Sequence, residues 1–354
     1  MELSTDVPHF NVCISDDDII NGAKEIVKRL RPSWPSDQFL YKIFTNGISN
    51  KLVGIYYKDN YEQMVLVRVY GRKTDLLIDR KQEIQNIKIL HNAGHTHSIY
   101  ATFENGLAYE YVEGDTLDTR SVRKPEVYTL VAKRLAEMHL LRPFTSDFGH
   151  NESVIWQKTE KFMRLMPKCF SDIDKQKKFE KLIKPLSTLL QEYQMMKDNL
   201  SKIESPVVFC HNDLLLTNIL YNERENKVTF IDFEYAAYNN QAFDIANHFS
   251  EFAGVDNPDF SLYPDEEFQK SWLRIYLQTY KKTSDVSEDD VADLYRQVNQ
   301  FVLLTHFFWG CWSLIQSENS LIDFDFLEYA AIRFNEYFKR KQVNVPSENE
   351  IRNV

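Results

Sequence analysis

The segment PVVFCHNDLLLTNILYNERENKVTFID at 206–232 constrains the fold of this chain more than any other. Its apolar, β-branched runs PVVFC, NILYN and KVTFID predict three short strands, and NERENK predicts a hairpin turn between the last two. HNDLLLT is then a loop that leaves one strand, and Asp232 ends another strand of the same small sheet. Because loops held by rigid strands commonly carry catalytic groups, we expect Asp213, Asn218 and Asp232 to converge at one edge.

These three side chains are of the kind that phosphoryl transfer requires. Mg²⁺ prefers hard oxygen ligands and takes one or two carboxylates together with phosphate oxygens. A further carboxylate must accept or orient the proton of the attacking hydroxyl. Protein kinases meet both needs with H-R-D-L-x-x-x-N and a later Asp-Phe-Gly, and His211 to Asn218 has that loop's spacing, with Asp232 as the second acid. Either half alone would more simply be turn caps or a surface acid, but the two together favour catalysis.

The remaining sequence divides into a strand-rich first third and a helix-rich remainder. Before Gly114, the patterns predict helices over 16–31 and 79–94 and strands in QFLYKIF, KLVGIYYK, EQMVLVRVYG and, on either side of Asn105-Gly106, SIYATFENGLAYEYVEG. After it they predict helices at 124–141, around 155–203, and at 266–282, 287–318 and 325–340. We therefore expect an α+β protein with two lobes, 1–112 and 113–354.

Composition narrows the classes of partner and compartment. The net charge of -10 disfavours binding to nucleic acid or to an anionic membrane surface. The four cysteines form no CxxC pair, which indicates reduced thiols and no zinc site. MELSTDVPHFNV has no apolar run typical of a signal peptide, and FVLLTHFFWGCWSLI at 301–315 is too short to span a bilayer. We expect a soluble, cytoplasmic protein without stable membrane insertion.

Several longer stretches resemble the choline/ethanolamine kinase family. CHNDLLLTNILYNE, VTFIDFEYAAYNNQAFDIANHFSEFAGV and THFFWGCWSLIQ resemble the family as a whole, and FTNGISNKLVG, VLVRVYGRKTDLLIDR and FSLYPDEEFQKSWL are similar to its ethanolamine kinase branch. The resemblance implies a protein-kinase-like bilobal fold and ATP-dependent phosphorylation of ethanolamine to phosphoethanolamine, the first step toward phosphatidylethanolamine. It makes Asp213 the catalytic base and Asn218 and Asp232 ligands of Mg²⁺, in agreement with the chemistry above.

The resemblance also implies how ATP phosphates would be held. Arg68, in VLVRVYG, matches the position of the strand Lys that grips ATP in protein kinases, and a guanidinium can hold phosphate bidentately. Glu83, in DRKQEIQNIKIL, matches the helix Glu that would pair with Arg68. From spacing alone, Arg68 is equally well a surface residue of an edge strand, and Glu83 is more simply a solvated helix residue.

FTNGISNK at 44–51 looks like the family's nucleotide-covering loop, although it carries one glycine where kinases have GxGxxG. As a bare motif it would usually be a hairpin turn. Backbone N–H groups and short polar side chains would contact the phosphates. The loop residues concerned are Asn46, Gly47, Ser49 and Asn50. The backbone of Glu110, Tyr111 and Val112, where the lobes join, is expected to bind adenine.

The acceptor end is implied by aromatic residues three apart on two helices. Trp309 and Trp312 share one helix face, and Phe326 and Tyr329 share another. Their spacing alone favours core packing, but the matching aromatics of the family line the amino-alcohol pocket, where π faces attract a cation. Glu251, in HFSEFAG, matches a carboxylate near the ammonium group. Ethanolammonium can donate hydrogen bonds to it, whereas the quaternary nitrogen of choline has none to donate.

Two further residues of these motifs, Asp244 and His211, are expected to be structural. Asp244 would accept backbone N–H bonds from the catalytic loop, and His211 would pack within that loop.

Three alternative functions remain. Choline kinase is the nearest alternative; an aminoglycoside-type phosphotransferase and a catalytically dead kinase-like binding module are the others. A homodimer and a monomer are both compatible with the apolar helices.

Overall fold

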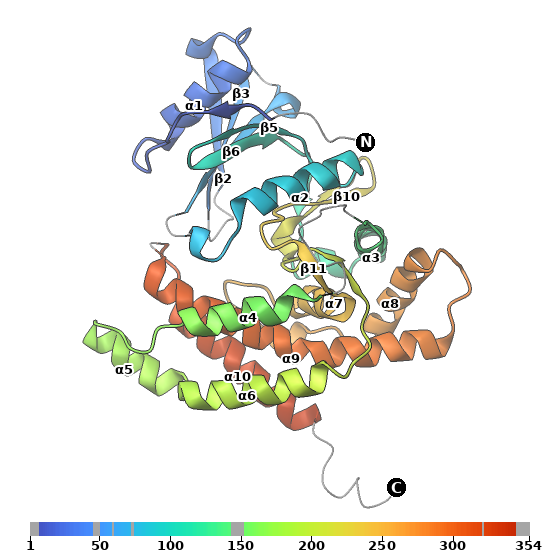
Figure 1. Ribbon diagram of the computed structural model, residues 1–354. Coiled ribbons are helices and arrows are strands. Elements are labelled where there is room, and N and C mark those ends of the chain that lie inside the picture. The colour runs from blue at the N-terminus through green and yellow to red at the C-terminus, as the bar shows by residue number, and fades with distance from the viewer. Residues whose placement is uncertain are drawn as a thin grey trace, which may run out of the picture. The chain divides into compact units, whose positions relative to one another are not determined.

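The computed structural model describes residues 7–44, 50–58, 60–71, 74–142, 152–320 and 322–344. The chain forms two compact units, each built from two stretches of sequence (Figure 1). Unit 1 contains Met1–Thr116 and Thr217–Tyr235, and unit 2 contains Leu117–Leu216 and Ala236–Val354. The sequence predicted a single boundary after residue 112. The structure instead places the boundary near residue 116 and adds residues 217–235 to the N-terminal unit. The division into two functional lobes stays a prediction.

Unit 1 is built on a six-stranded sheet of order β1-β5-β6-β4-β3-β2. β1 pairs with β5 in parallel, and the other neighbours are antiparallel. The strands are β1 (His9–Phe10), β2 (Phe39–Phe44), β3 (Asn50–Tyr57), β4 (Val65–Tyr70), β5 (Ile99–Phe103) and β6 (Gly106–Glu110). This confirms the strands predicted in the first third, including the turn at Asn105-Gly106; β1 was not predicted.

Two helices belong to unit 1, and both were predicted. α1 (Ile19–Leu30) packs its apolar side onto the sheet, where Ala23 and Val27 are fully buried in one core with Val53 and Val67 of β3 and β4. Burying such a Val side chain stabilises the fold by about 1.5–3 kcal/mol. α2 (Arg80–Asn92) is capped by Asp79, whose carboxylate accepts hydrogen bonds from the amides of the first helical turn. α2 brings Glu83 into the interior.

A second, three-stranded sheet of unit 1 has the order β10-β9-β7. It consists of β7 (Asp115–Thr116), β9 (Ile219–Asn222) and β10 (Lys227–Phe230), so the predicted hairpin is confirmed. The expectation that PVVFC belongs to the same sheet was wrong. β8 (Val207–Cys210) pairs instead with β11 (Ala237–Asn240) in unit 2. The sequence AYNN of β11 carries little strand signal, because its Asn239 is buried by a hydrogen bond to Asn212 rather than by apolar contacts.

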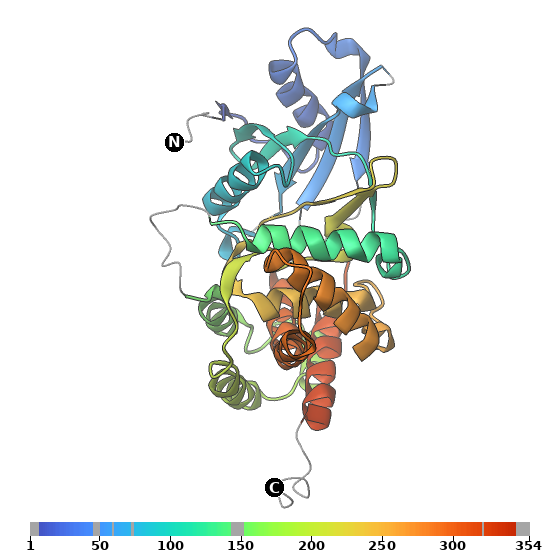
Figure 2. The ribbon, with the colours of Figure 1, turned by 90° about the vertical axis from the view of Figure 1, so that its right-hand side faces the viewer.

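Unit 2 is mainly helical. Its helices are α3 (Pro125–His139), α4 (Val154–Leu165), α5 (Ile173–Leu182), α6 (Leu186–Leu200), α7 (Gln241–Ser250), α8 (Glu266–Tyr280), α9 (Glu288–Asn319) and α10 (Phe326–Asn344). α9 packs along both α10 and α7, and α3 lies beside α8, as Figures 1 and 2 show. All but α7 lie where helices were predicted. None of the helices in the described part of the chain is both long and apolar enough for a membrane span.

Short 3₁₀ helices connect these elements. They span Ser36–Gln38, Tyr61–Gln63, Thr74–Leu76, Ser121–Arg123, Leu216–Asn218, Glu251–Ala253 and Phe260–Leu262. All four cysteines are free, as expected, with Cys210 and Cys311 buried. Two loop residues adopt left-handed backbone conformations: Asn212, next to Asp213, with φ 67°, and the predicted site residue Asp232 with φ 63°. Such conformations are uncommon for residues other than glycine and often mark functional loops.

Candidate active site

Arg68, Glu83 and Asp232 meet inside unit 1. Arg68 points from β4 and donates hydrogen bonds to Glu83 Oε1 and, over 2.8 Å, to Asp232 Oδ1. Burial alone would lower the pKa of Arg68, but the surrounding groups, Asp232 first among them, together outweigh it and raise the pKa, so this residue stays a cation. The pairing of Arg68 with Glu83 expected from the sequence is therefore confirmed, and the alternative of a surface Arg68 is excluded because it is 6% exposed.

A second arginine, Arg80, completes this cluster and was not predicted. It donates to Glu83 Oε2 over 2.9 Å and to Glu234 Oε2 over 3.0 Å. Its guanidinium lies 4.0 Å from the ring centre of Tyr70, and Asn50 donates to Glu234 over 3.2 Å. Asn50 is thus placed in the cluster, although its predicted contact with phosphate stays a prediction. These residues are brought together by the fold and show no regular spacing along the sequence.

The cluster could hold a metal ion at one of its carboxylates. Glu83, Asp232 and Glu234 offer oxygen atoms within 4.8 Å of one another. The side chains of Glu83 and Glu234 are 0% and 4% exposed and already bind arginines, whereas that of Asp232 is 28% exposed. Asp232 is therefore the carboxylate that a divalent cation can reach. Its hard oxygen, with the amide oxygen of Asn218, fits the ligands that Mg²⁺ prefers.

The other predicted nucleotide contacts are placed in part. Asn46, Gly47 and Ser49 lie outside the described residues. At the end of β6, the Glu110 amide donates to Ser98 O over 2.9 Å, and the Tyr111 amide donates to Met64 O over 3.3 Å. An adenine ring would therefore have to bind Glu110 through its carbonyl rather than its N–H. The predicted contacts of Glu110 and Val112 with adenine stay predictions.

Asp213 lies in the loop that follows β8, within unit 2, and this loop is held from below by Asp244 of α7. The carboxylate of Asp244 accepts the amides of His211 over 2.8 Å and Asn212 over 2.6 Å, and the imidazole of His139 over 2.9 Å. His211 Nδ1 in turn accepts the amide of Asp213 over 3.3 Å. The structural roles expected for Asp244 and His211 are confirmed.

Burial and hydrogen bonding act in opposite directions on Asp244. Burial alone would raise its pKa, but the His139 imidazole and the loop amides favour the carboxylate, and the pKa is lowered. His139 also bonds to the hydroxyl of Tyr276 over 2.7 Å. His248 supports the same loop from α7 through Leu214 O, and burial lowers its pKa to about 4. The loop that carries Asp213 is therefore fixed by fully buried polar groups.

We expect Asp244→Asn to lower the free energy of unfolding by about 1–3 kcal/mol. An asparagine would turn N–H groups toward at least one of the three donors that now meet a carboxylate, leaving buried donors unpaired. The measurement is urea denaturation followed by circular dichroism. Asp174→Asn is a suitable control, because that side chain is 94% exposed. Equal stability of the two variants would contradict the role of Asp244.

The predicted aromatic residues form a continuous row in unit 2. Ring centres are 5.6 Å apart for Trp309 and Trp312 and 5.8 Å for Trp312 and Phe326. Phe324, which was not predicted, links Phe326 to Tyr329 with ring distances of 4.8 and 5.5 Å. Asn247 accepts a hydrogen bond from the Trp309 indole over 2.7 Å. The charge of Asp213 contributes to the raised pKa of Tyr329, whose main cause is burial, so the loop that carries Asp213 lies near this row.

Glu251 is the carboxylate of the same region, and it is paired with an arginine that was not predicted. Arg333 of α10 donates to Glu251 Oε1 over 2.9 Å and to the Tyr329 hydroxyl over 3.3 Å. Both members of the ion pair are buried. Arg333 thus links Glu251 to Tyr329 of the aromatic row, a link of which the sequence gave no sign. The predicted contact of Glu251 with an ammonium group stays a prediction.

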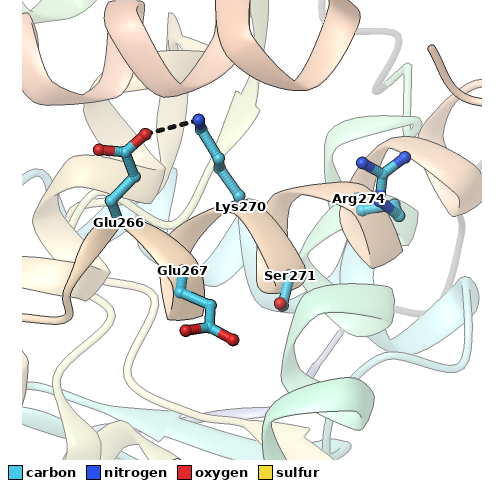
Figure 3. A pocket seen from close by; sticks show the side chains of 5 residues that line it. All are labelled: Glu266, Glu267, Lys270, Ser271 and Arg274. Carbon is cyan, nitrogen blue, oxygen red and sulfur yellow. Dashed lines mark ion pairs between the residues drawn. The ribbon is translucent and has the colours of Figure 1, made fainter. Parts of the chain in front are cut away.

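A pocket on the surface of α8 contains none of the predicted site residues (Figure 3). It is lined by Glu266, Glu267, Lys270, Ser271 and Arg274. Lys270 pairs with Glu266 over 2.5 Å, and Arg274 pairs with Glu288 over 2.6 Å. Ion pairs of this exposed kind contribute little to stability. The pocket is an ordinary charged helix surface.

Comparison with known proteins shows which family this chain belongs to. The family model described as choline/ethanolamine kinase matches residues 41–338. Human ethanolamine kinase 1 is 45% identical over 96% of this chain and 76% of its own length, and Drosophila melanogaster ethanolamine kinase is 41% identical over 95% and 80%. The structure of a Plasmodium vivax ethanolamine kinase has a TM-score of 0.79 at 29% identity, covering 92% of this chain and 90% of that one. The predicted α+β, protein-kinase-like fold is confirmed, and the chain belongs to the choline/ethanolamine kinase family.

Proposed function

We propose that this protein is an ethanolamine kinase, which transfers the γ-phosphoryl group of ATP to the hydroxyl of ethanolamine and releases phosphoethanolamine and ADP. The observation that carries the proposal is the 41–45% identity, over at least 95% of the chain, with relatives that are named ethanolamine kinases. The anchored loop of Asp213, the arginine–carboxylate cluster and the aromatic row supply groups suited to this reaction. Phosphatidylethanolamine synthesis, a cytoplasmic location and a homodimer remain parts of the proposal.

Each chemical requirement of phosphoryl transfer can be assigned to a candidate residue of this chain. Asp213 would orient the acceptor hydroxyl and accept its proton. Arg68, held as a cation between two carboxylates, would bind ATP phosphate oxygens. Asp232 and Asn218 would hold Mg²⁺, which when bound neutralises charge on the β and γ phosphates. The protein's own contribution is mainly positioning and charge stabilisation.

The acceptor class follows from the aromatic row and Glu251. The π faces of Trp309, Trp312 and Tyr329, which lie in one row, would attract a cationic head group. The same faces would attract choline, so they do not separate the two amino alcohols. Glu251 can accept hydrogen bonds from a primary ammonium, which favours ethanolamine. Closely packed indole rings also leave little polar surface for a bulky aminoglycoside.

We expect kcat/KM for ethanolamine to exceed that for choline by about tenfold or more, the amount that one charge-assisted hydrogen bond supplies. The measurement is ADP release by the purified protein with ATP and Mg²⁺ over a range of each amino alcohol. An aminoglycoside serves as the third acceptor.

Each outcome of that comparison identifies one function. Preference for ethanolamine supports the proposal, and equal or better use of choline assigns the protein to the sister activity of its family. Turnover of the aminoglycoside alone would identify the protein as an aminoglycoside-type phosphotransferase. Absence of acceptor-dependent ADP release would refute a kinase activity and favour a binding module.

A further inference from the structure

The position of Glu251 in the fold is electrostatically unfavourable for a carboxylate. Glu251 directly follows α7 and is 1% exposed, so it lies at the negative end of the helix dipole and away from water. Burying a charge without a partner costs several kcal/mol. A cation must therefore compensate Glu251, and Arg333, 0% exposed, is that cation.

The ion pair uses only part of its hydrogen-bonding capacity. Arginine and carboxylate commonly form two parallel hydrogen bonds. Here a single guanidinium nitrogen, Nη1 of Arg333, donates to Glu251 Oε1 and also to Tyr329 Oη. Among the described residues, the buried Oε2 of Glu251 and the Nε and Nη2 of Arg333 have no hydrogen-bond partner. Buried polar atoms normally have partners, so Oε2 is a prepared acceptor for a donor from outside the protein.

The charges around Oε2 of Glu251 nearly cancel, so a hydrogen bond directed at this atom matters more for ligand binding than the net charge of the site. Arg333 and Glu251 cancel each other, and the Arg333 guanidinium is itself flanked by the rings of Phe260 and Tyr329 at 5.9 and 5.8 Å. Burial, with Arg333 nearby, lowers the pKa of His306, which therefore adds no positive charge. A cation that reaches this neutral pair gains mainly by donating an N–H to Oε2.

We propose that Arg333 is a specificity-determining positioning residue: by engaging Oε1 of Glu251 it leaves Oε2 to accept an N–H from the ammonium of the acceptor. This deepens the proposed function and rests on it. A primary ammonium satisfies Oε2. A quaternary ammonium leaves it unpaired, and a site built around a hydrogen bond discriminates strongly against a ligand that cannot form it. Arg333 thus acts on the substrate through Glu251 without touching it.

The test is a double-mutant cycle of Arg333→Met and Glu251→Gln, measured as kcat and KM for ethanolamine and for choline. In Arg333→Met the lone carboxylate is no longer held, and we expect KM for ethanolamine to rise about tenfold or more while KM for ATP changes little. The ratio of ethanolamine to choline kcat/KM should fall by a similar factor. Glu251→Gln leaves Arg333 as an uncompensated cation that repels the ammonium, so ethanolamine kcat/KM should fall further.

The double variant separates positioning from a general structural effect. If Arg333 acts through Glu251, adding Arg333→Met to Glu251→Gln should restore part of the lost ethanolamine kcat/KM, because it removes the repelling charge. A further loss in the double variant, or an unchanged ethanolamine-to-choline ratio in Arg333→Met, would overturn the proposal. Glu251→Gln alone, which is isosteric, must still lower that ratio if Arg333→Met does not fold.

A matched control is Arg340→Met. Arg340 lies on the same helix and pairs with Glu336 over 2.7 Å rather than with Glu251. We expect its substrate ratio to equal that of the natural protein. If the natural protein shows no ethanolamine-dependent ADP release, the proposed function fails, and this is distinct from a failed cycle in an active enzyme.

Discussion

Asp213→Asn is expected to lower kcat by about 10²- to 10⁴-fold, the range typical of removing a positioned general base. Asparagine has nearly the same shape, so the loop should stay anchored through the His211 and Asn212 amides on Asp244. The binding of ATP should change little, because Arg68 and its partners are not altered. The measurement is ADP release at saturating substrates, with ATP affinity measured separately by calorimetry.

Two results would contradict this role of Asp213. A variant that keeps more than about a tenth of the kcat would show that the proton leaves by another route. A variant that loses kcat together with a large fall in melting temperature would assign Asp213 to folding instead. Asp256→Asn, a change at an exposed position, gives the baseline for both measurements.

The elements with regular periodicity were predictable from sequence, and irregular ones were not. α1 and α8 alternate buried and exposed positions at helical spacing, so their existence could be read directly from the sequence. α7 was missed because all of its residues are buried, which erases the periodic signal. β11 was missed because Asn239 pairs by side-chain hydrogen bonds rather than by apolar packing.

The candidate site divides in the same way. Asp213, Asn218 and Asp232 could be proposed because their spacing along one loop and hairpin reflects their chemistry. Partners from distant segments left no such trace: 154 residues separate Arg80 from Glu234, and 82 separate Arg333 from Glu251. A buried arginine on a helix is indistinguishable in sequence from an exposed one, so its role emerges only when the fold supplies the carboxylate.

Two acids of the arginine–carboxylate cluster, Asp232 and Glu234, should respond differently to substitution. Asp232→Asn removes the carboxylate that a metal ion can reach, and we expect kcat to fall by about 10²-fold or more, since metal-ion stabilisation of a phosphoryl-transfer transition state is worth several kcal/mol. Its stability should fall by only about 1 kcal/mol, because Arg68 keeps Glu83 and the asparagine oxygen remains an acceptor.

Glu234→Gln is the matched control for Asp232→Asn, and here stability rather than activity should suffer. The Glu234 side chain is 4% exposed and neutralises Arg80, so its loss leaves a buried guanidinium with less compensation. Removing one partner of a buried ion pair lowers the free energy of unfolding by about 3–5 kcal/mol. We expect a loss toward the lower end of this range, because Arg80 keeps its ion pair with Glu83. Urea denaturation and a Mg²⁺ titration of ADP release, applied to both variants, measure the two effects. If Glu234→Gln raised the Mg²⁺ requirement as much as Asp232→Asn, the metal would have to be assigned to both carboxylates, and the difference in exposure between them would lose its functional meaning.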